Sequence, residues 1–156
     1  MDVTDTRAPH GERTQEERNK ELFRRFIDEG FGTGDLAAVD AFFPADVTPP
    51  QAGVQPPSRA GVKGLIALLH TAFPQLTVTI EDIAADGDKV WARLRGQGTH
   101  RGEFMGLPPT GKAVAVDIID ICRFEGGKIV EHWGLTDRFG LMTQVGMLPR
   151  SPQTAT

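Results

Sequence analysis

The chain has 156 residues, a formal net charge of −4 and one cysteine, Cys122. This length suits a single domain with a sizeable core. A lone cysteine excludes an intrachain disulfide, and mixed charges without a basic cluster argue against a nucleic-acid partner.

The two ends of the chain predict little structure. Residues 1–13 are polar and aperiodic, so we expect a disordered lead, and they lack the apolar core of a secretion signal. The longest aliphatic stretch, Leu65–Leu69, is far too short to cross a bilayer. We therefore expect a cytoplasmic protein without a membrane partner, with one domain over residues 14–147 and a flexible tail over 148–156.

The first half of the chain predicts three helices. Thr14 and Glu17 form a capping box before apolar residues at helical spacing. Each predicted helix has a polar residue at its start and glycine or proline at its end. In chain order these are Thr14 and Gly30 or Gly32, Asp35 and Pro44, and Ser58 and Pro74. Residues 47–57 hold four prolines and predict an irregular loop.

The second half predicts an antiparallel meander, because apolar and polar residues alternate there. In chain order, the elements are strands from Leu76 and from Val90, a long strand Ala113–Phe124, a return strand Lys128–Leu135 and a closing helix Asp137–Val145. Turns are expected at Gly87 and at Gly126-Gly127. Helices followed by a meander indicate an α+β fold: a cone-shaped α+β barrel, with a curved antiparallel sheet around about three helices. A ligand pocket is expected in its open mouth.

Two segments of this second half resemble the SnoaL-like polyketide cyclases. They are Gly98–Gly111, GTHRGEFMGLPPTG, and Asp120–Trp133, DICRFEGGKIVEHW, and Gln144–Gly146 also fits. The resemblance runs from about Gln15 to Gly146. It implies the cone fold of nuclear transport factor 2, the ketosteroid isomerases and limonene epoxide hydrolase, and catalysis without metal or cofactor.

The resemblance also implies where catalytic groups lie. In the family's cyclases, a histidine on the long strand and an aspartate on the return strand do acid/base work during an aldol ring closure. These positions are Asp120 and Gly134 here, and a nearby glutamine position is Ile118. The family's cyclase pair is therefore replaced, and the mostly uncharacterised ester cyclases of the wider group share this Asp120 pattern.

Strand parity brings Asp120 and His132 to one face. A bulged turn at Gly126-Gly127 places Cys122 opposite His132 and Asp120 opposite Gly134. Matching to the family turns this face into the pocket, with Gly134 expected to leave open volume. Asp120 is either a general base or a structural carboxylate bonded to histidine or water. His132 either protonates an oxygen and orients Asp120, or is structural.

Two further polar residues have a catalytic and a structural interpretation. His100, in the glycine-rich loop at the expected cone mouth, is a catalytic candidate or makes a hydrogen bond that holds the loop. Asp137, before the closing helix, is a catalytic acid or a helix N-cap. None of these candidates has metal-ligand spacing, so we expect no metal site.

The functional prediction is a cofactor-independent cyclase or isomerase that acts on a polyketide-like or terpenoid-like small molecule of secondary metabolism by acid/base catalysis. One alternative is an epoxide hydrolase or epoxide-opening cyclase that uses Asp120. Another is a non-catalytic domain that binds a small apolar ligand.

The opposite face of the sheet predicts a homodimer. Ile119, Ile121 and Trp133 are expected on the outer side, with Ile129 nearby and with an Arg123–Glu131 ion pair at the rim. Trp91 is expected in the core or the pocket wall. A second copy of the chain would cover the apolar face by an isologous contact.

Overall fold

The structure is a computed structural model that describes residues 13–45 and 58–148. Apart from residues 13 and 148, the expected lead, the proline-rich loop 47–57 and the tail lie outside the described residues. The elements described below fall within the predicted domain, residues 14–147.

Helices α1 and α3 begin where their caps predict. Helix α1 (Gln15–Phe26) has the complete Thr14–Glu17 capping box and continues into a π-helical segment, Ile27–Gly32. Helix α3 (Arg59–Ala72) begins after Ser58, whose hydroxyl accepts from the Gly61 N–H. The second helix is shorter than predicted, because Asp35 caps a turn through the N–H groups of residues 37 and 38. Helix α2 therefore spans only Val39–Phe42.

Four strands form one antiparallel sheet in the order β1-β2-β3-β4. They are β1 (Thr77–Asp86), β2 (Lys89–Thr99), β3 (Ala113–Glu125) and β4 (Lys128–Thr136), and α4 (Arg138–Val145) follows. Gly87, Gly126 and Gly127 have positive φ angles of 60°, 56° and 76°, as tight hairpin turns require. The predicted meander and both of its turns are confirmed.

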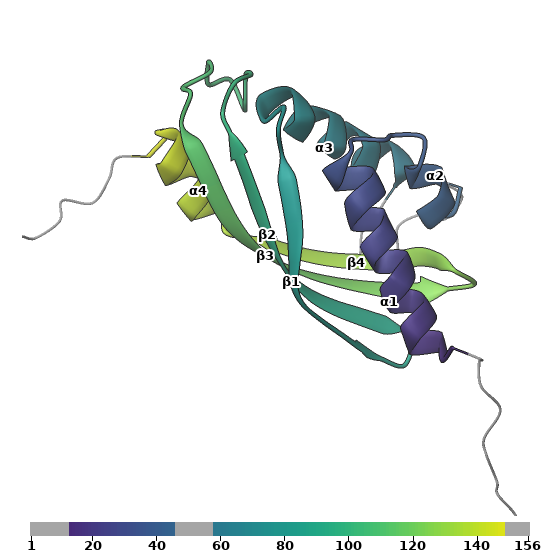
Figure 1. Ribbon diagram of the computed structural model, residues 1–156. Helices are drawn as coiled ribbons and strands as arrows, with labels where there is room; N and C mark the ends of the chain where they lie inside the picture. Colours follow the sequence, from purple (N-terminus) through teal and green to yellow (C-terminus); the bar gives the residue numbers. More distant parts are fainter. Residues whose placement is uncertain (1–12, 46–57, 149–156) are drawn as a thin grey trace, which may run out of the picture.

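Helices α1, α2 and α3 gather on one side of the strongly curved sheet, and α4 lies at the far end beside β3 (Figure 1). The predicted α+β class, with a curved antiparallel sheet around helices, is confirmed. The described residues contain no helix that is long and apolar enough to span a membrane.

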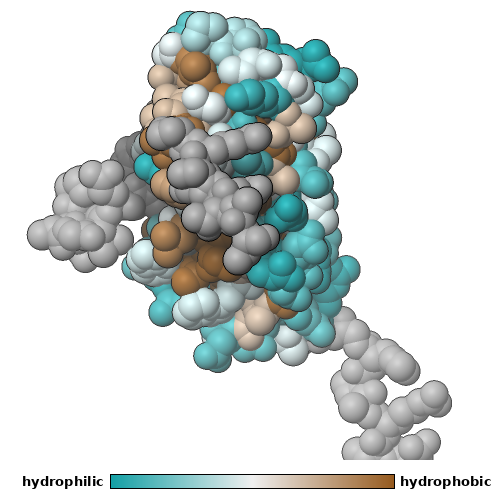
Figure 2. Space-filling model, turned by 90° about the vertical axis from the view of Figure 1, so that its left-hand side faces the viewer, coloured by the Kyte–Doolittle hydropathy of each residue, from teal (hydrophilic) through white to brown (hydrophobic). Residues whose placement is uncertain are grey.

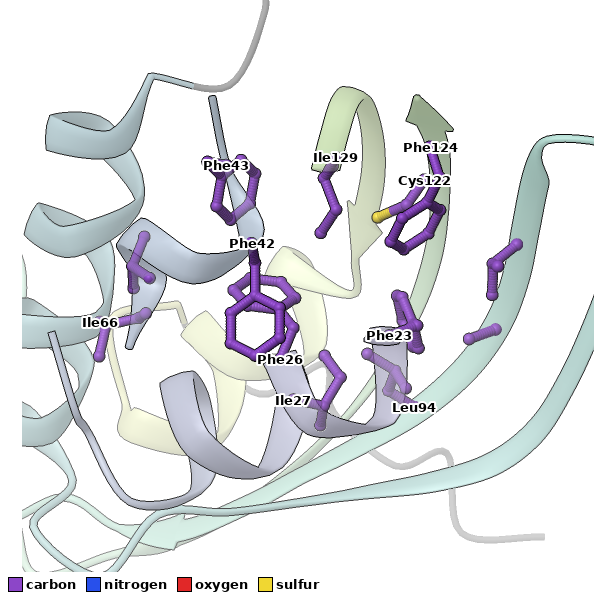
Figure 3. Packing of buried hydrophobic residues seen from close by; sticks show 13 residues of the cluster. Phe23, Phe26, Ile27, Phe42, Phe43, Ile66, Leu94, Cys122, Phe124 and Ile129 are labelled. Atoms are coloured by element: carbon purple, nitrogen blue, oxygen red, sulfur yellow. The ribbon is translucent and has the colours of Figure 1, made fainter. Parts of the chain in front are cut away.

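The core consists of two separate clusters, one toward each end of the long strands. The larger joins α1, α2 and α3 to β2, β3 and β4 through side chains such as Phe23, Phe42 and Phe124, and Figure 3 shows its side chains gathered between the helices and the strands. The smaller contains Ala72, Phe73, Phe104, Val114 and Val145. Each buried phenylalanine contributes about 1.5–3 kcal/mol relative to its exposed state.

Two apolar residues lie on the face opposite to the one expected. Trp91 is 47% exposed on the outer face of β2, whereas its neighbours Val90 and Ala92 are buried. Ile129 is fully buried in the larger core cluster. Trp91 points outward because adjacent residues of a strand face opposite sides and its neighbour Val90 points inward. Ile129 points inward because it pairs with Phe124, which is buried.

Candidate functional site

An irregularity in the β3–β4 hairpin determines which side chains reach the inner face. Phe124 pairs with Ile129, but Arg123 pairs with Glu131, so Val130 is an extra residue in β4. Directly opposed residues share a face of the sheet, and regular pairing beyond Phe124 would therefore have turned Glu131 and Trp133 inward. The bulge instead places His132 opposite Cys122 and Gly134 opposite Asp120, as predicted.

Asp120 and His132 form a hydrogen-bonded pair on this inner face. The distance from His132 Nε2 to Asp120 Oδ1 is 3.1 Å, and the carboxylate accepts the bond from the ring N–H. Asp120 is 6% exposed, whereas the His132 side chain is 36% exposed. The pair therefore joins a buried carboxylate, which can accept a proton, to an imidazole that reaches solvent.

The surroundings of Asp120 are apolar. Ala92 is its partner on β2, and Cys122 lies two residues along β3 on the same face. Burial raises the pKa of the Cys122 thiol well above its ordinary value, and the negative charge of Asp120 raises it further. The inner positions of β2 and β3, between Val90 and Gly98 and between Val114 and Phe124, contain no lysine or arginine. The Asp120 carboxylate thus has His132 as its ionisable hydrogen-bond partner among the described residues.

Gly134 differs from its sequence-based interpretation. A Cβ atom added at Gly134 would lie 2.8 Å from Asp120 Oδ1 and 3.3 Å from His132 Nε2. The space beside the glycine is therefore occupied by the pair itself and is not the open volume that was expected.

The structure places His100 away from this pair. His100 lies eight residues beyond Ala92, the β2 partner of Asp120, which is about 26 Å along a strand at ~3.3 Å per residue. It is fully buried between Phe73 and Phe104. Its Nδ1 accepts from the Thr110 hydroxyl at 2.9 Å and backbone N–H at 3.3 Å, a bond that holds the two ends of the glycine-rich loop together.

Asp137 occupies the N-cap of α4. Its Oδ1 accepts from the Gly140 N–H at 2.8 Å, and its own N–H donates to the Asp117 carbonyl. These bonds agree with the structural interpretation of Asp137, as the loop bond does for His100. The structure brings together two of the four candidates, Asp120 and His132, and the catalytic assignments of His100 and Asp137 stay predictions.

Some residues of this region were not found from the sequence. Thr110 holds His100, and Gln144 of α4 bonds both backbone groups of Ala115. Both residues lie in the segments that resemble the family, but their partners are ten or more residues away, so the sequence did not predict these contacts. The Arg123–Glu131 cross-strand ion pair was predicted from parity and is confirmed at 3.0 Å.

Two hollows among the described residues lie away from the pair. One, of about 340 Å³, lies between Arg24 of α1, Asp28 of the π-helical segment and the β1 segment from Val78 to Ile83. The other, of about 380 Å³, is lined by uncharged polar groups such as Gln97 and Gln144. Figure 2 shows hydrophobic surface gathered near the middle of the face that carries α4. Within residues 13–45 and 58–148, no three potential metal ligands lie together.

The sequence matches known proteins over most of its length. A family model described as SnoaL-like polyketide cyclase matches residues 21–145. The aklanonic acid methyl ester cyclase DnrD of Streptomyces peucetius is 29% identical over 131 residues, which cover 81% of this chain and 89% of DnrD. The cyclase of the same description from Streptomyces sp. (strain C5), DauD, is also 29% identical, over 81% of this chain and 80% of DauD.

Solved structures share the fold. TsrD from Streptomyces laurentii superposes with a TM-score of 0.74 at 27% identity, over 88% of this chain and 100% of TsrD. IdmH from Streptomyces antibioticus superposes with a TM-score of 0.69 at 32% identity, over 82% of this chain and 98% of IdmH.

Proposed function

This chain belongs to the SnoaL-like polyketide cyclase family, and from that membership we propose that it is a cofactor-independent cyclase or isomerase acting on a polyketide-like small molecule. The observation that supports acid/base catalysis is the Asp120–His132 pair, a buried carboxylate bonded to a partly exposed imidazole on the inner face of the sheet. We assign the general base to Asp120 and its orientation to His132.

The proposed reaction needs no external reactant. Asp120 takes a proton from a carbon next to a carbonyl group, and the resulting enolate attacks a second carbonyl carbon of the same molecule. A carbon–carbon bond forms, and the protonated Asp120 returns its proton to the new alkoxide oxygen. His132 Nε2–H holds the carboxylate in one orientation between the two proton transfers. Atoms and charge balance, because substrate and product are isomers. Positioned proton transfer of this kind contributes about 10²–10⁴-fold in rate.

A second candidate is a domain that binds a small ligand without catalysis. Its support is that the Asp120–His132 bond gives the buried carboxylate a hydrogen-bond partner, as a purely structural pair would. The two candidates differ in what a loss of the Asp120 charge does: it stops a reaction in the first case, and changes only stability or binding in the second.

The test uses Asp120→Asn and aklanonic acid methyl ester, the compound in the relatives' names, as the probe. We expect kcat to fall by about 10²–10⁴-fold, because the amide cannot accept the proton, while the melting temperature stays close to that of the wild type. Asp117→Asn is the matched control, since Asp117 lies on the outer face of β3, paired with Arg95. Unchanged turnover in Asp120→Asn contradicts the assignment of the base. A wild-type chain that binds the ester without consuming it supports the second candidate.

We also propose that two copies of the chain pair through the outer face of the sheet. Trp91, Ile121 and Trp133 lie directly opposite one another across β2, β3 and β4, and Ile119 and Leu135 lie in the next row. Trp91 and Trp133 are 47% and 40% exposed. An apolar patch of this kind is typical of a protein interface.

The charges around this outer face favour a second copy as the partner. The arginines beside the patch are already paired within the chain: Arg93 with Asp82, Arg95 with Asp117 and Arg123 with Glu131. Lys89 Nζ also lies 6.0 Å from the centre of the Trp133 ring. A partner therefore meets apolar side chains surrounded by three internally neutralised pairs and one lysine, a surface that a second copy can cover across a two-fold axis.

A further inference from the structure

We infer that Gly134 is a positioning residue of the catalytic pair, because its missing side chain is what allows Asp120 and His132 to meet. This inference rests on the proposed function only for its kinetic consequence. Its geometric part concerns the two side chains alone.

The pair is diagonal across the hairpin. Asp120 lies directly opposite Gly134, whereas His132 lies opposite Cys122. Diagonal positions are roughly 7–8 Å apart, farther than directly opposed ones, so both side chains must lean toward each other along the strands. The path between them passes over the inner side of Gly134.

The place of a Cβ atom at Gly134 is the junction of the pair. That position is 2.8 Å from Asp120 Oδ1, 3.1 Å from His132 Cε1 and 3.3 Å from His132 Nε2. The two bonded atoms, Oδ1 and Nε2, are themselves 3.1 Å apart. A methyl group there would touch both ends of the hydrogen bond, and contacts under 3.0 Å are essentially absent from real Cβ atoms.

The backbone gives no other reason for glycine at this position. Seven glycines of the described chain have positive φ angles, and Gly134 is not among them. Its strand conformation is open to any residue. The absent side chain therefore serves the contact between its neighbours.

The direct test is Gly134→Ala, followed by NMR of the His132 ring at one fixed pH. The methyl displaces the free end of the Asp120 side chain, not backbone, so we expect the hairpin to fold normally. The His132 Nε2 resonance should move toward its position in Asp120→Asn, the reference in which the carboxylate is lost. Gly64→Ala is the control, because a Cβ at Gly64 meets nothing within 4 Å. An unmoved His132 resonance in folded Gly134→Ala overturns the inference.

A second measurement needs no variant. In the wild-type protein, one Gly134 Hα occupies the Cβ direction and faces the His132 ring carbon Cε1. We expect a nuclear Overhauser contact between this Hα and His132 Hε1, and its absence also overturns the inference.

The kinetic consequence follows by a double-mutant cycle with aklanonic acid methyl ester. Gly134→Ala should lower kcat about tenfold or more with little change in KM, and its effect should be smaller in a His132→Gln background, since both changes break one contact. Fully additive effects contradict a role through the pair. If the ester is not turned over at all, the proposed function fails while both NMR results still decide the inference.

Discussion

At the scale of a single residue, the thiol pKa of Cys122 reflects the apolar surroundings of the site. It is fully buried on the inner face of β3, and its thiol pKa is raised first by burial and then by the charge of Asp120. A raised pKa lowers the thiolate fraction, and the thiolate is the reactive form.

We therefore predict that native Cys122 resists alkylation by iodoacetamide near pH 8, at a rate about 100-fold or more below that of a free cysteine. In denaturant the same thiol should react fully, as followed by mass spectrometry. Asp120→Asn removes the smaller cause and leaves the burial, so protection should persist there. Rapid labelling of the folded wild-type protein would show that solvent reaches this part of the inner face.

At the scale of elements, one side chain of α4 makes hydrogen bonds to the backbone of β3 where β3 has no neighbouring strand. Pairing with β4 ends at Ile118 and Thr136, so the β3 residues before Ile118 have no strand on that side. Gln144 of α4 takes the place of a strand: its Oε1 accepts from the Ala115 N–H at 2.7 Å, and its Nε2 donates to the Ala115 carbonyl at 3.0 Å. The amide thus ties α4 to the sheet.

Gln144→Ala should destabilise the fold by about 1–3 kcal/mol, because both Ala115 backbone groups lose their partners in a partly buried place. Chemical denaturation measures this change. Gln144→Glu is the graded control, since its carboxylate keeps the acceptor and loses the donor, and it should fall between the alanine variant and the wild type. Equal stability of all three proteins would mean that water replaces the amide without loss.

At the scale of the whole molecule, we predict that the protein is a dimer formed through the outer face of the sheet. Light scattering at micromolar concentration should give about twice the chain mass of 17.0 kDa. Trp133→Glu should shift the protein toward monomer, because it replaces a large apolar side chain of the contact with a charge that the dimer would have to bury. Leu65→Glu is the control, as Leu65 is exposed on α3, which lies on the other side of the sheet (Figure 1). A wild-type mass near that of one chain contradicts the dimer.

The sequence by itself determined the order of the elements and the register of the site hairpin. Caps such as Thr14 and Ser58, the two-residue alternation and the glycine turns are local signals, and local backbone preferences follow from neighbouring residues. The alternation of side chains between the two faces, with a bulged turn at Gly126-Gly127, then predicted that Asp120 lies opposite Gly134 and Cys122 opposite His132, as the structure shows. Family motifs in Gly98–Gly111 indicated the same fold.

Only the tertiary structure decided which side chains contact one another within this arrangement of strands and helices. The role of Gly134 depends on where the ends of Asp120 and His132 lie, and the edge bond of Gln144 depends on the docking of α4. The separation of His100 from Asp120 depends on the length of β2 between them. Each is a contact or a distance between residues far apart in the chain, which local periodicity does not encode and packing in three dimensions does.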